Sequence, residues 1–86
     1  MHGLMMDSPL LITEIMRFAE RNFADREVVS VTFDNPRHRT HLGEVFRRAR
    51  KLANALQAAG VKQGDRVATL AWNDYRHLEL YYAVSC

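Results

Sequence analysis

The sequence predicts an α/β domain, and three segments lead to that prediction. Leu42 to Gln57 has apolar residues at the spacing of an amphipathic helix. Glu27 to Phe33 is rich in β-branched residues that alternate with polar ones, which is typical of a half-buried strand. Arg66 to Trp72 is apolar on both faces, as a central parallel strand covered by helices is. The expected order is a helix, a β-hairpin, a long helix, a buried parallel-type strand and the start of a further helix.

Length and composition limit the classes of protein that fit. The 86 residues form at most one small domain, and a 48% hydrophobic content argues against disorder. The formal charge of +2 gives only a weak electrostatic field, so we expect no nucleic-acid partner. Cys86 is the only cysteine, which excludes an internal disulfide and favours a reducing compartment. No apolar run approaches the roughly 20 residues of a membrane span, and no targeting signal is recognisable, so we expect a cytoplasmic protein.

The first helix is expected from Pro9 to Asn22. Ser8 looks like its N-cap, with Pro9 at the first helical position, where a missing N–H costs nothing. Residues 1–7 before it are expected to be a flexible or dimer-contacting arm, in which Met5 and Met6 offer apolar contacts. Apolar residues at helical spacing support this helix: Ile12, Ile15, Met16 and Ala19.

A β-hairpin is expected next. The first strand is Glu27 to Phe33, and Asp34-Asn35-Pro36 has the residues of a turn. The return strand, Arg37 to Thr40, is short and polar, which suits an exposed edge.

The long helix has the clearest boundaries. His41 stands where a cap is wanted, and Glu44 three residues later resembles a capping box in which histidine replaces serine or threonine. Glu44 also precedes Arg47 and Arg48 in a favourable order for helix ion pairs. Gly60 is expected to end the helix in the left-handed conformation. The face expected to be buried consists of Leu42, Val45, Phe46, Ala49, Leu52, Ala53 and Leu56.

The last helix is expected to follow the buried strand, with Asn73 as its cap. Leu78, Tyr81 and Tyr82 are expected on its inner face, and Trp72 is expected in the core. A strand that is apolar on both faces needs neighbouring strands on both sides, and the hairpin is at most one neighbour. We therefore expect the sequence to be the beginning of a larger protein, or the ordered part of one.

Several side chains that could carry chemistry have simpler structural interpretations. The basic run Arg47 to Lys51 suits phosphate contact, but we favour the solvated face of an amphipathic helix because no aromatic stacking platform accompanies it. His38 and His41 lack the further ligands that zinc needs and lie beside arginines. His77 has no nucleophile placed with it, and Cys86 has no activating neighbour. No metal site is expected.

A combination of short motifs between His38 and Val84 resembles the N-terminal region of the adenylate-forming acyl-CoA synthetases. A second set resembles the fatty-acid and methylthiopropionate CoA-ligase branch of that family. One departure is His41, which stands where the family has threonine. The motifs of the first set are His41-Leu42-Gly43-Glu44, Leu52-Ala53-Asn54-Ala55-Leu56, Gly60-Val61-Lys62-Gln63-Gly64-Asp65-Arg66-Val67 and a strand ending in Asn73. Those of the second are Ala68-Thr69-Leu70-Ala71-Trp72-Asn73 with Arg76-His77-Leu78-Glu79, and Gly3-Leu4-Met5-Met6 followed by Pro9-Leu10-Leu11-Ile12.

This resemblance implies that the complete protein joins a carboxylic acid to AMP from Mg-ATP, releases pyrophosphate, and passes the acyl group to the CoA thiol. It implies that the phosphate loop and the catalytic lysine lie beyond Cys86. No catalytic, cofactor-binding or metal-binding residue is therefore assigned within residues 1–86, and this chain alone is expected to be inactive. Residues 1–86 would be the N-terminal fragment of the large adenylate-forming domain, without its remainder and without the small C-terminal domain. The resemblance also implies a homodimer.

Two alternatives stay open at this point. The same scaffold serves other adenylation enzymes, such as aryl-acid ligases and peptide-synthetase modules. A small interaction module that uses the basic helix is a different class, and it predicts salt-dependent binding of nucleic acid.

Overall fold

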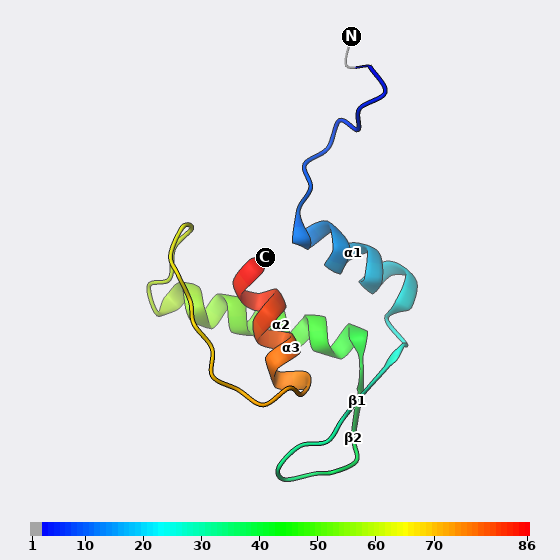
Figure 1. Ribbon diagram of the computed structural model, residues 1–86, viewed down its shortest axis with the longest axis vertical. Helices are drawn as coiled ribbons and strands as arrows, with labels where there is room; N and C mark the ends of the chain where they lie inside the picture. The colour runs from blue at the N-terminus through cyan, green and yellow to red at the C-terminus, as the bar shows by residue number, and fades with distance from the viewer. Residues whose placement is uncertain (1–2) are drawn as a thin grey trace.

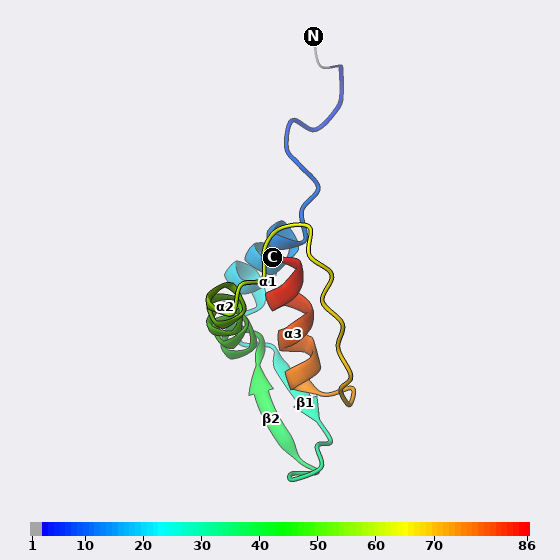
Figure 2. The same cartoon turned by 90° about the vertical axis from the view of Figure 1, so that its left-hand side faces the viewer.

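Three helices and one β-hairpin make up the computed structural model of this chain. The structure describes residues 3–86, so Met1 and His2 of the expected arm lie outside the described residues. In Figure 1, α2 and α3 cross, the hairpin extends from one end of α2, and residues 3–11 project away from the helices. In Figure 2, α3 lies between α2 and the segment that connects them. The α/β class is therefore confirmed. The elements are α1 (Ile12–Phe23), β1 (Glu27–Ser30), β2 (His38–His41), α2 (Leu42–Ala58) and α3 (Tyr75–Ser85).

The hydrophobic core is centred on α2, as the spacing of its apolar residues predicts. Val45 and Phe46 are almost completely buried, with 0% and 1% of their surface exposed, and Ala49 continues the same stripe. Met16 of α1 packs against them, and the Tyr82 ring of α3 meets the Phe46 ring edge to face at 5.1 Å between centroids. Edge-to-face geometry brings the positive edge of one ring to the negative face of the other. The three helices thus share one small core.

Helix α1 starts later than the sequence suggested. Its N-cap is Leu11, which makes no side-chain cap, and Ser8 and Pro9 lie exposed in the arm instead. Extending a helix by a turn fixes the backbone of each added residue, and burial of apolar surface offsets that loss of entropy. Leu10 is 90% exposed and finds no such surface among residues 3–86, so the prediction of a start at Pro9 is wrong.

The hairpin is confirmed, with a shorter first strand than expected. β1 and β2 pair antiparallel from Glu27 opposite His41 to Ser30 opposite His38. The ladder stops where Thr32 forms a turn of its own: its Oγ1 accepts a hydrogen bond from the Asn35 N–H at 2.9 Å. Residues 31–33, which the sequence placed in the strand, are outside it. The polar residues Ser30 and Thr32 are the buried ones here, whereas Val29, Val31 and Phe33 are exposed.

Both ends of α2 are stabilised by the backbone. His41 is the N-cap but makes no side-chain cap, so the capping-box prediction is wrong. The N–H groups of Leu42 and Gly43 donate instead to the carbonyl oxygens of Arg26 and Ala24, each at 2.9 Å, because the α1–β1 loop folds over the helix start. Glu44 is thereby free to pair with Arg47, as predicted.

The C-terminal end of α2 matches its prediction. Gly60 has φ = +100°, a conformation that residues with a Cβ rarely adopt. The Val61 N–H donates to the Leu56 carbonyl and the Gly60 N–H to the Gln57 carbonyl, both at 3.1 Å. These two bonds are the Schellman arrangement, which satisfies carbonyl oxygens that the helix itself leaves unpaired.

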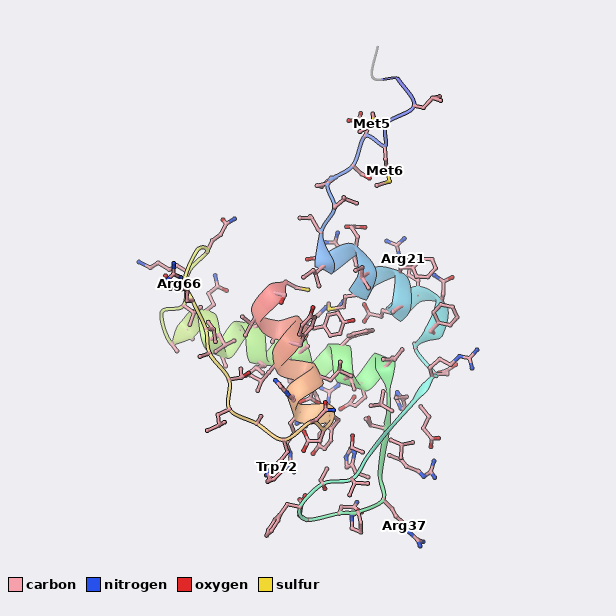
Figure 3. All side chains as sticks on the ribbon, in the orientation of Figure 1. Met5, Met6, Arg21, Arg37, Arg66 and Trp72 are labelled. Carbon is pink, nitrogen blue, oxygen red and sulfur yellow. The ribbon has the colours of Figure 1, made fainter. Side chains whose placement is uncertain are left out.

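The expected buried strand from Arg66 to Trp72 is not a strand in this structure. The segment is extended beside α3, where Thr69 Oγ1 lies 3.2 Å from His77 Nε2. Leu70 is fully exposed and Trp72 is 83% exposed, and Figure 3 shows Trp72 pointing away from the helices. A strand is defined by hydrogen bonds to a neighbouring strand, and no other segment of residues 3–86 pairs with this one. Placing Trp72 in the core was wrong for the same reason.

Helix α3 is capped one residue later than predicted. Asp74, not Asn73, is its N-cap, and the Asp74 carboxylate accepts from the N–H groups of Arg76 and His77 at 2.9 and 3.3 Å. On the helix itself, Leu78 and Tyr82 face the core as expected. Tyr81 is 57% exposed, so its expected place on the inner face was wrong.

This cap gives a direct test of the start of α3. We expect Asp74→Ala to lower the free energy of unfolding by about 1 kcal/mol, because two helix N–H groups lose their acceptor. Asn73→Ala is the matched control and is expected to change little. Urea unfolding followed by circular dichroism measures both variants, and a larger loss in the Asn73 variant would contradict the assignment.

Candidate functional site

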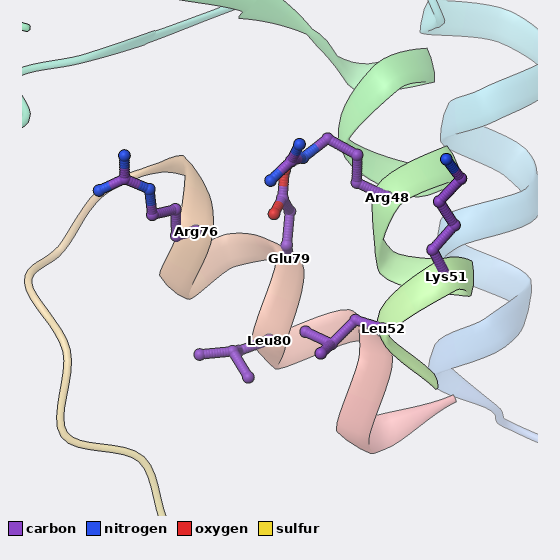
Figure 4. A pocket seen from close by; sticks show the side chains of 6 residues that line it. All are labelled: Arg48, Lys51, Leu52, Arg76, Glu79 and Leu80. Atoms are coloured by element: carbon purple, nitrogen blue, oxygen red, sulfur yellow. The ribbon is translucent and has the colours of Figure 1, made fainter. Parts of the chain in front are cut away.

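An open groove lies between α2 and α3, and we call it the α2–α3 groove. Its volume is about 460 Å³. Each helix supplies three side chains at positions i, i+3 and i+4, which places them on one face of the helix. Figure 4 shows Arg48 and Glu79 meeting in the middle, with Leu52 and Leu80 facing each other beside them. The lining consists of Arg48, Lys51 and Leu52 from α2 and Arg76, Glu79 and Leu80 from α3.

An ion pair between a buried carboxylate and a half-exposed arginine forms the centre of the groove. Arg48 Nε donates to Glu79 Oε1 at 2.6 Å, and only 7% of the Glu79 side chain is exposed. The hydrogen bond and the charge of Glu79 raise the pKa of Arg48 above its usual value. A carboxylate taken out of water is costly unless a cation and hydrogen bonds compensate it. Arg48 therefore holds α2 and α3 together through this pair.

Tyr75 connects the groove to the hairpin. Its ring stacks on the His38 imidazole at 3.9 Å between centroids and 7° between planes. The guanidinium groups of Arg48 and Arg76 lie 5.8 and 5.1 Å from the Tyr75 ring centroid, within cation–π range. The Tyr75 N–H also donates to the Ser30 hydroxyl at 3.1 Å. Sheet, helix and groove are thus joined at one residue.

The sequence analysis did not predict that Tyr75 joins the hairpin to α3 or that Glu79 pairs with α2. Glu79 had one detectable signal, since it lies beside Leu78 and one turn from Tyr82, on the face that was expected to be apolar. A charge on such a face predicts a buried partner. Tyr75 had no comparable signal, because its position depends on how the hairpin folds back.

The basic run on α2 is engaged in ion pairs within the fold. Arg47 pairs with Glu44, Arg48 with Glu79, and Arg50 Nη1 donates to Glu20 Oε1 of α1 at 2.7 Å. In each case the hydrogen bond to the carboxylate raises the pKa of the arginine. Lys51 has no ion pair with any residue from 3 to 86. These pairs support the interpretation of the run as a helix face.

The histidines are separated by the fold. His38 lies between the hairpin and α3 and stacks on Tyr75, His41 is exposed at the start of α2, and His77 meets Thr69. Among residues 3–86, no three histidine, cysteine or acidic side chains are grouped as metal ligands would be. Cys86 is exposed at the end of α3. The six residues that line the groove include no serine, cysteine or histidine, so the groove offers anion contact and apolar contact but no hydroxyl, thiol or imidazole nucleophile.

Acid is expected to weaken two ion pairs, one between α1 and α2 and one within α2. Hydrogen bonds from Arg50 and Arg47 lower the pKa values of Glu20 and Glu44 below the ordinary 4.5, partly offset by desolvation. A carboxyl whose folded pKa is lowered stabilises the fold above its unfolded pKa and loses that contribution as the pH falls through the folded pKa. We expect the urea midpoint to be constant from pH 7 to pH 6 and to fall below about pH 4.

The control for this prediction is Arg50→Gln, which removes the partner of Glu20. Its urea midpoint is expected to be lower at neutral pH and to fall less on acidification. A midpoint that fell equally in both proteins would assign the acid effect to other groups.

Comparison with known proteins gives consistent matches. The family model described as AMP-binding enzyme matches residues 16–85. The 3-methylmercaptopropionyl-CoA ligase of Ruegeria lacuscaerulensis is 46% identical over 85 residues, and the medium-chain-fatty-acid–CoA ligase of Ectopseudomonas oleovorans is 49% identical over 85 residues. Each alignment covers 99% of this chain and 16% of the relative. The long-chain-fatty-acid–CoA ligase of Thermus thermophilus is 48% identical over 80 residues, which are 93% of this chain and 15% of the relative.

The chain thus spans about one sixth of the length of the curated relatives it matches. Among residues 3–86, no helix has the length and apolar composition to cross a bilayer.

Proposed function

We propose, from the premise that this chain belongs to the AMP-binding enzyme family, that it is the N-terminal segment of the large domain of an ATP-dependent carboxylic acid–CoA ligase. One observation carries the proposal: the chain aligns along nearly its whole length with relatives named as CoA ligases, at 46% and 49% identity. A fatty acid or a short-chain methylthio acid is the proposed substrate, after the printed names of those relatives.

In such a ligase the reaction forms an acyl adenylate from the acid and Mg-ATP and then an acyl-CoA thioester. Phosphate transfer of this kind requires cations and N–H groups aimed at the phosphate oxygens. The α2–α3 groove does not fit that task, since a magnesium site takes several oxygen ligands and the groove has a single carboxylate, which is paired with Arg48. We therefore assign the segment a scaffold role and route no chemical step through it.

The extended segment Arg66–Trp72 supports the scaffold role. Its apolar residues suit a strand covered on both faces, yet Leu70 and Trp72 are exposed in this chain. We propose that it becomes a strand of a larger sheet supplied by the rest of the ligase. The isolated chain is then inactive, because the sheet and the reacting groups are both outside it.

Residues 1–7 are proposed as a flexible or dimer-contacting arm of a cytoplasmic, homodimeric enzyme. Leu4, Met5 and Met6 are exposed, and Figure 3 shows Met5 and Met6 far from the helices. Methionine side chains adapt readily to irregular apolar surfaces, which suits contact with a second subunit. Sedimentation of the complete ligase with and without residues 1–7 tests this arm, and an unchanged mass would contradict it.

Acid-dependent exchange of pyrophosphate into ATP tests the function. The assay compares the 86-residue chain with the product of the complete reading frame that encodes it, over fatty, methylthio and aryl acids. We expect exchange only with the complete product and only with fatty or methylthio acids. Exchange by the 86-residue chain would overturn the scaffold role, and exclusive use of an aryl acid would favour the aryl-acid alternative.

A further inference from the structure

The α2–α3 groove combines positive charge with apolar surface. Three cationic side chains and one carboxylate line it, so two positive charges are not balanced within the lining. Leu52 and Leu80 are partly buried and face each other across it (Figure 4). Such a combination suits a ligand with an anionic head and an aliphatic body.

Two of the three cations are available to a ligand. Arg48 is committed to Glu79 by a 2.6 Å hydrogen bond, whereas Lys51 has no ion pair among residues 3–86. Arg76 reaches the Asp34 carboxylate only at 3.3 and 3.5 Å, and both side chains are about half exposed or more. An exposed pair with this geometry is weak and exchanges readily with another anion.

The positions of Lys51 and Arg76 suit contact with the anionic head of a ligand. In Figure 4, Lys51 and Arg76 lie toward opposite ends of the groove, with the Arg48–Glu79 pair between them. An anionic head can therefore pair with a cation at either end while its aliphatic body lies on the leucines. Because Arg48 already neutralises Glu79, this central carboxylate does not leave a net negative charge opposing the ligand.

We propose that the α2–α3 groove binds small organic anions that carry a carboxylate or phosphate head on a short unbranched aliphatic body. The groove volume of about 460 Å³ lies in the range of small-molecule sites. All six residues that line the groove belong to this chain, and binding there requires no chemical step. The proposal therefore does not depend on the ligase function, and binding is measured without ATP or CoA.

Titration of the ¹⁵N-labelled 86-residue chain with sodium decanoate or decyl phosphate, below the concentrations at which they form micelles, tests the proposal. We expect a dissociation constant on the order of 1 mM for a ligand of this size, with the shifts centred on residues of the groove. Decyltrimethylammonium carries the same chain on a cationic head and is expected to bind at least tenfold more weakly. Failure of both anions to bind, or equal binding of the cation, overturns the proposal.

Substitutions in the groove test whether the ligand binds there or on another apolar surface of the chain. Lys51→Gln is expected to weaken binding about threefold, and Lys51→Gln with Arg76→Gln about tenfold. Lys62→Gln is the matched control, because Lys62 is an exposed lysine on the turn after α2 and outside the groove. Lys51 has no ion pair to lose within residues 3–86, so the single variant remains informative if the Arg76 change disturbs α3. Unchanged affinity in the double variant, or shifts centred on the exposed Ile15 and Phe18 of α1, would place the ligand elsewhere.

Discussion

Phe46→Ala is expected to remove most of the free energy of unfolding of this chain at 25 °C. Phe46 is 1% exposed, lies at the centre of the only buried cluster formed by residues 3–86, and contacts the Tyr82 ring of α3. Truncating a buried phenylalanine costs about 3–5 kcal/mol, through lost transfer free energy and the cavity left behind. Small domains have total stabilities near the lower end of about 5–15 kcal/mol. Far-ultraviolet circular dichroism during urea titration measures the effect.

Phe18→Ala is the matched control for this experiment. Phe18 lies on α1, is 62% exposed, and contacts only the edge of Phe23 in its aromatic pair. The same truncation there removes little buried surface, and the expected change is below about 1 kcal/mol. If Phe46→Ala and Phe18→Ala shifted the urea midpoint equally, the core would not be centred on α2.

Arg48→Met is expected to give the second largest loss, about 2 kcal/mol. Methionine keeps most of the aliphatic stem but removes the cation, which leaves the Glu79 carboxylate without its partner in a nearly water-free position. Breaking a fully buried pair costs about 3–5 kcal/mol, and the smaller value reflects the Arg48 side chain, 47% of which is exposed to screening water. Thermal unfolding checks the loss.

Two further variants define the origin of that loss. Arg47→Met changes the neighbouring arginine, whose partner Glu44 is on the same exposed face, and is expected to shift the midpoint little. Arg48→Met combined with Glu79→Leu is expected to recover most of the stability, because no uncompensated charge remains. A double variant as unstable as the single one would mean that packing of the arginine stem, and not the charge pair, is what α3 requires.

The sequence predicted those parts of the fold that depend on near neighbours in the chain. The periodicity of Leu42 to Gln57 located α2, and Gly60 marked its end, because both signals operate within one or two helical turns. The antiparallel pairing of β1 and β2 followed from a turn that brings adjacent segments together.

Features that depend on distant residues could not be predicted in this way. His41 looked like a cap, but the backbone carbonyls of Ala24 and Arg26 took that role after the α1–β1 loop folded over the helix. Asn73 and Asp74 are both good caps, and only the position of Tyr75 against Ser30 selects between them. The α2–α3 groove is formed by residues about 30 positions apart in the chain. Their residue types could be read from the sequence, but their proximity in space could not.

The unpaired segment Arg66–Trp72 has a consequence for how this chain behaves at high concentration. After Arg66 it contains no charge, proline or glycine, it includes β-branched and aromatic residues, and it stands extended with its N–H groups making no backbone hydrogen bond within residues 3–86. Segments of this kind are templates for cross-β assembly, in which identical strands from many molecules stack on one another. The same residues that suit the centre of a large sheet would therefore make the isolated chain prone to form fibrils, unless another strand covers them first.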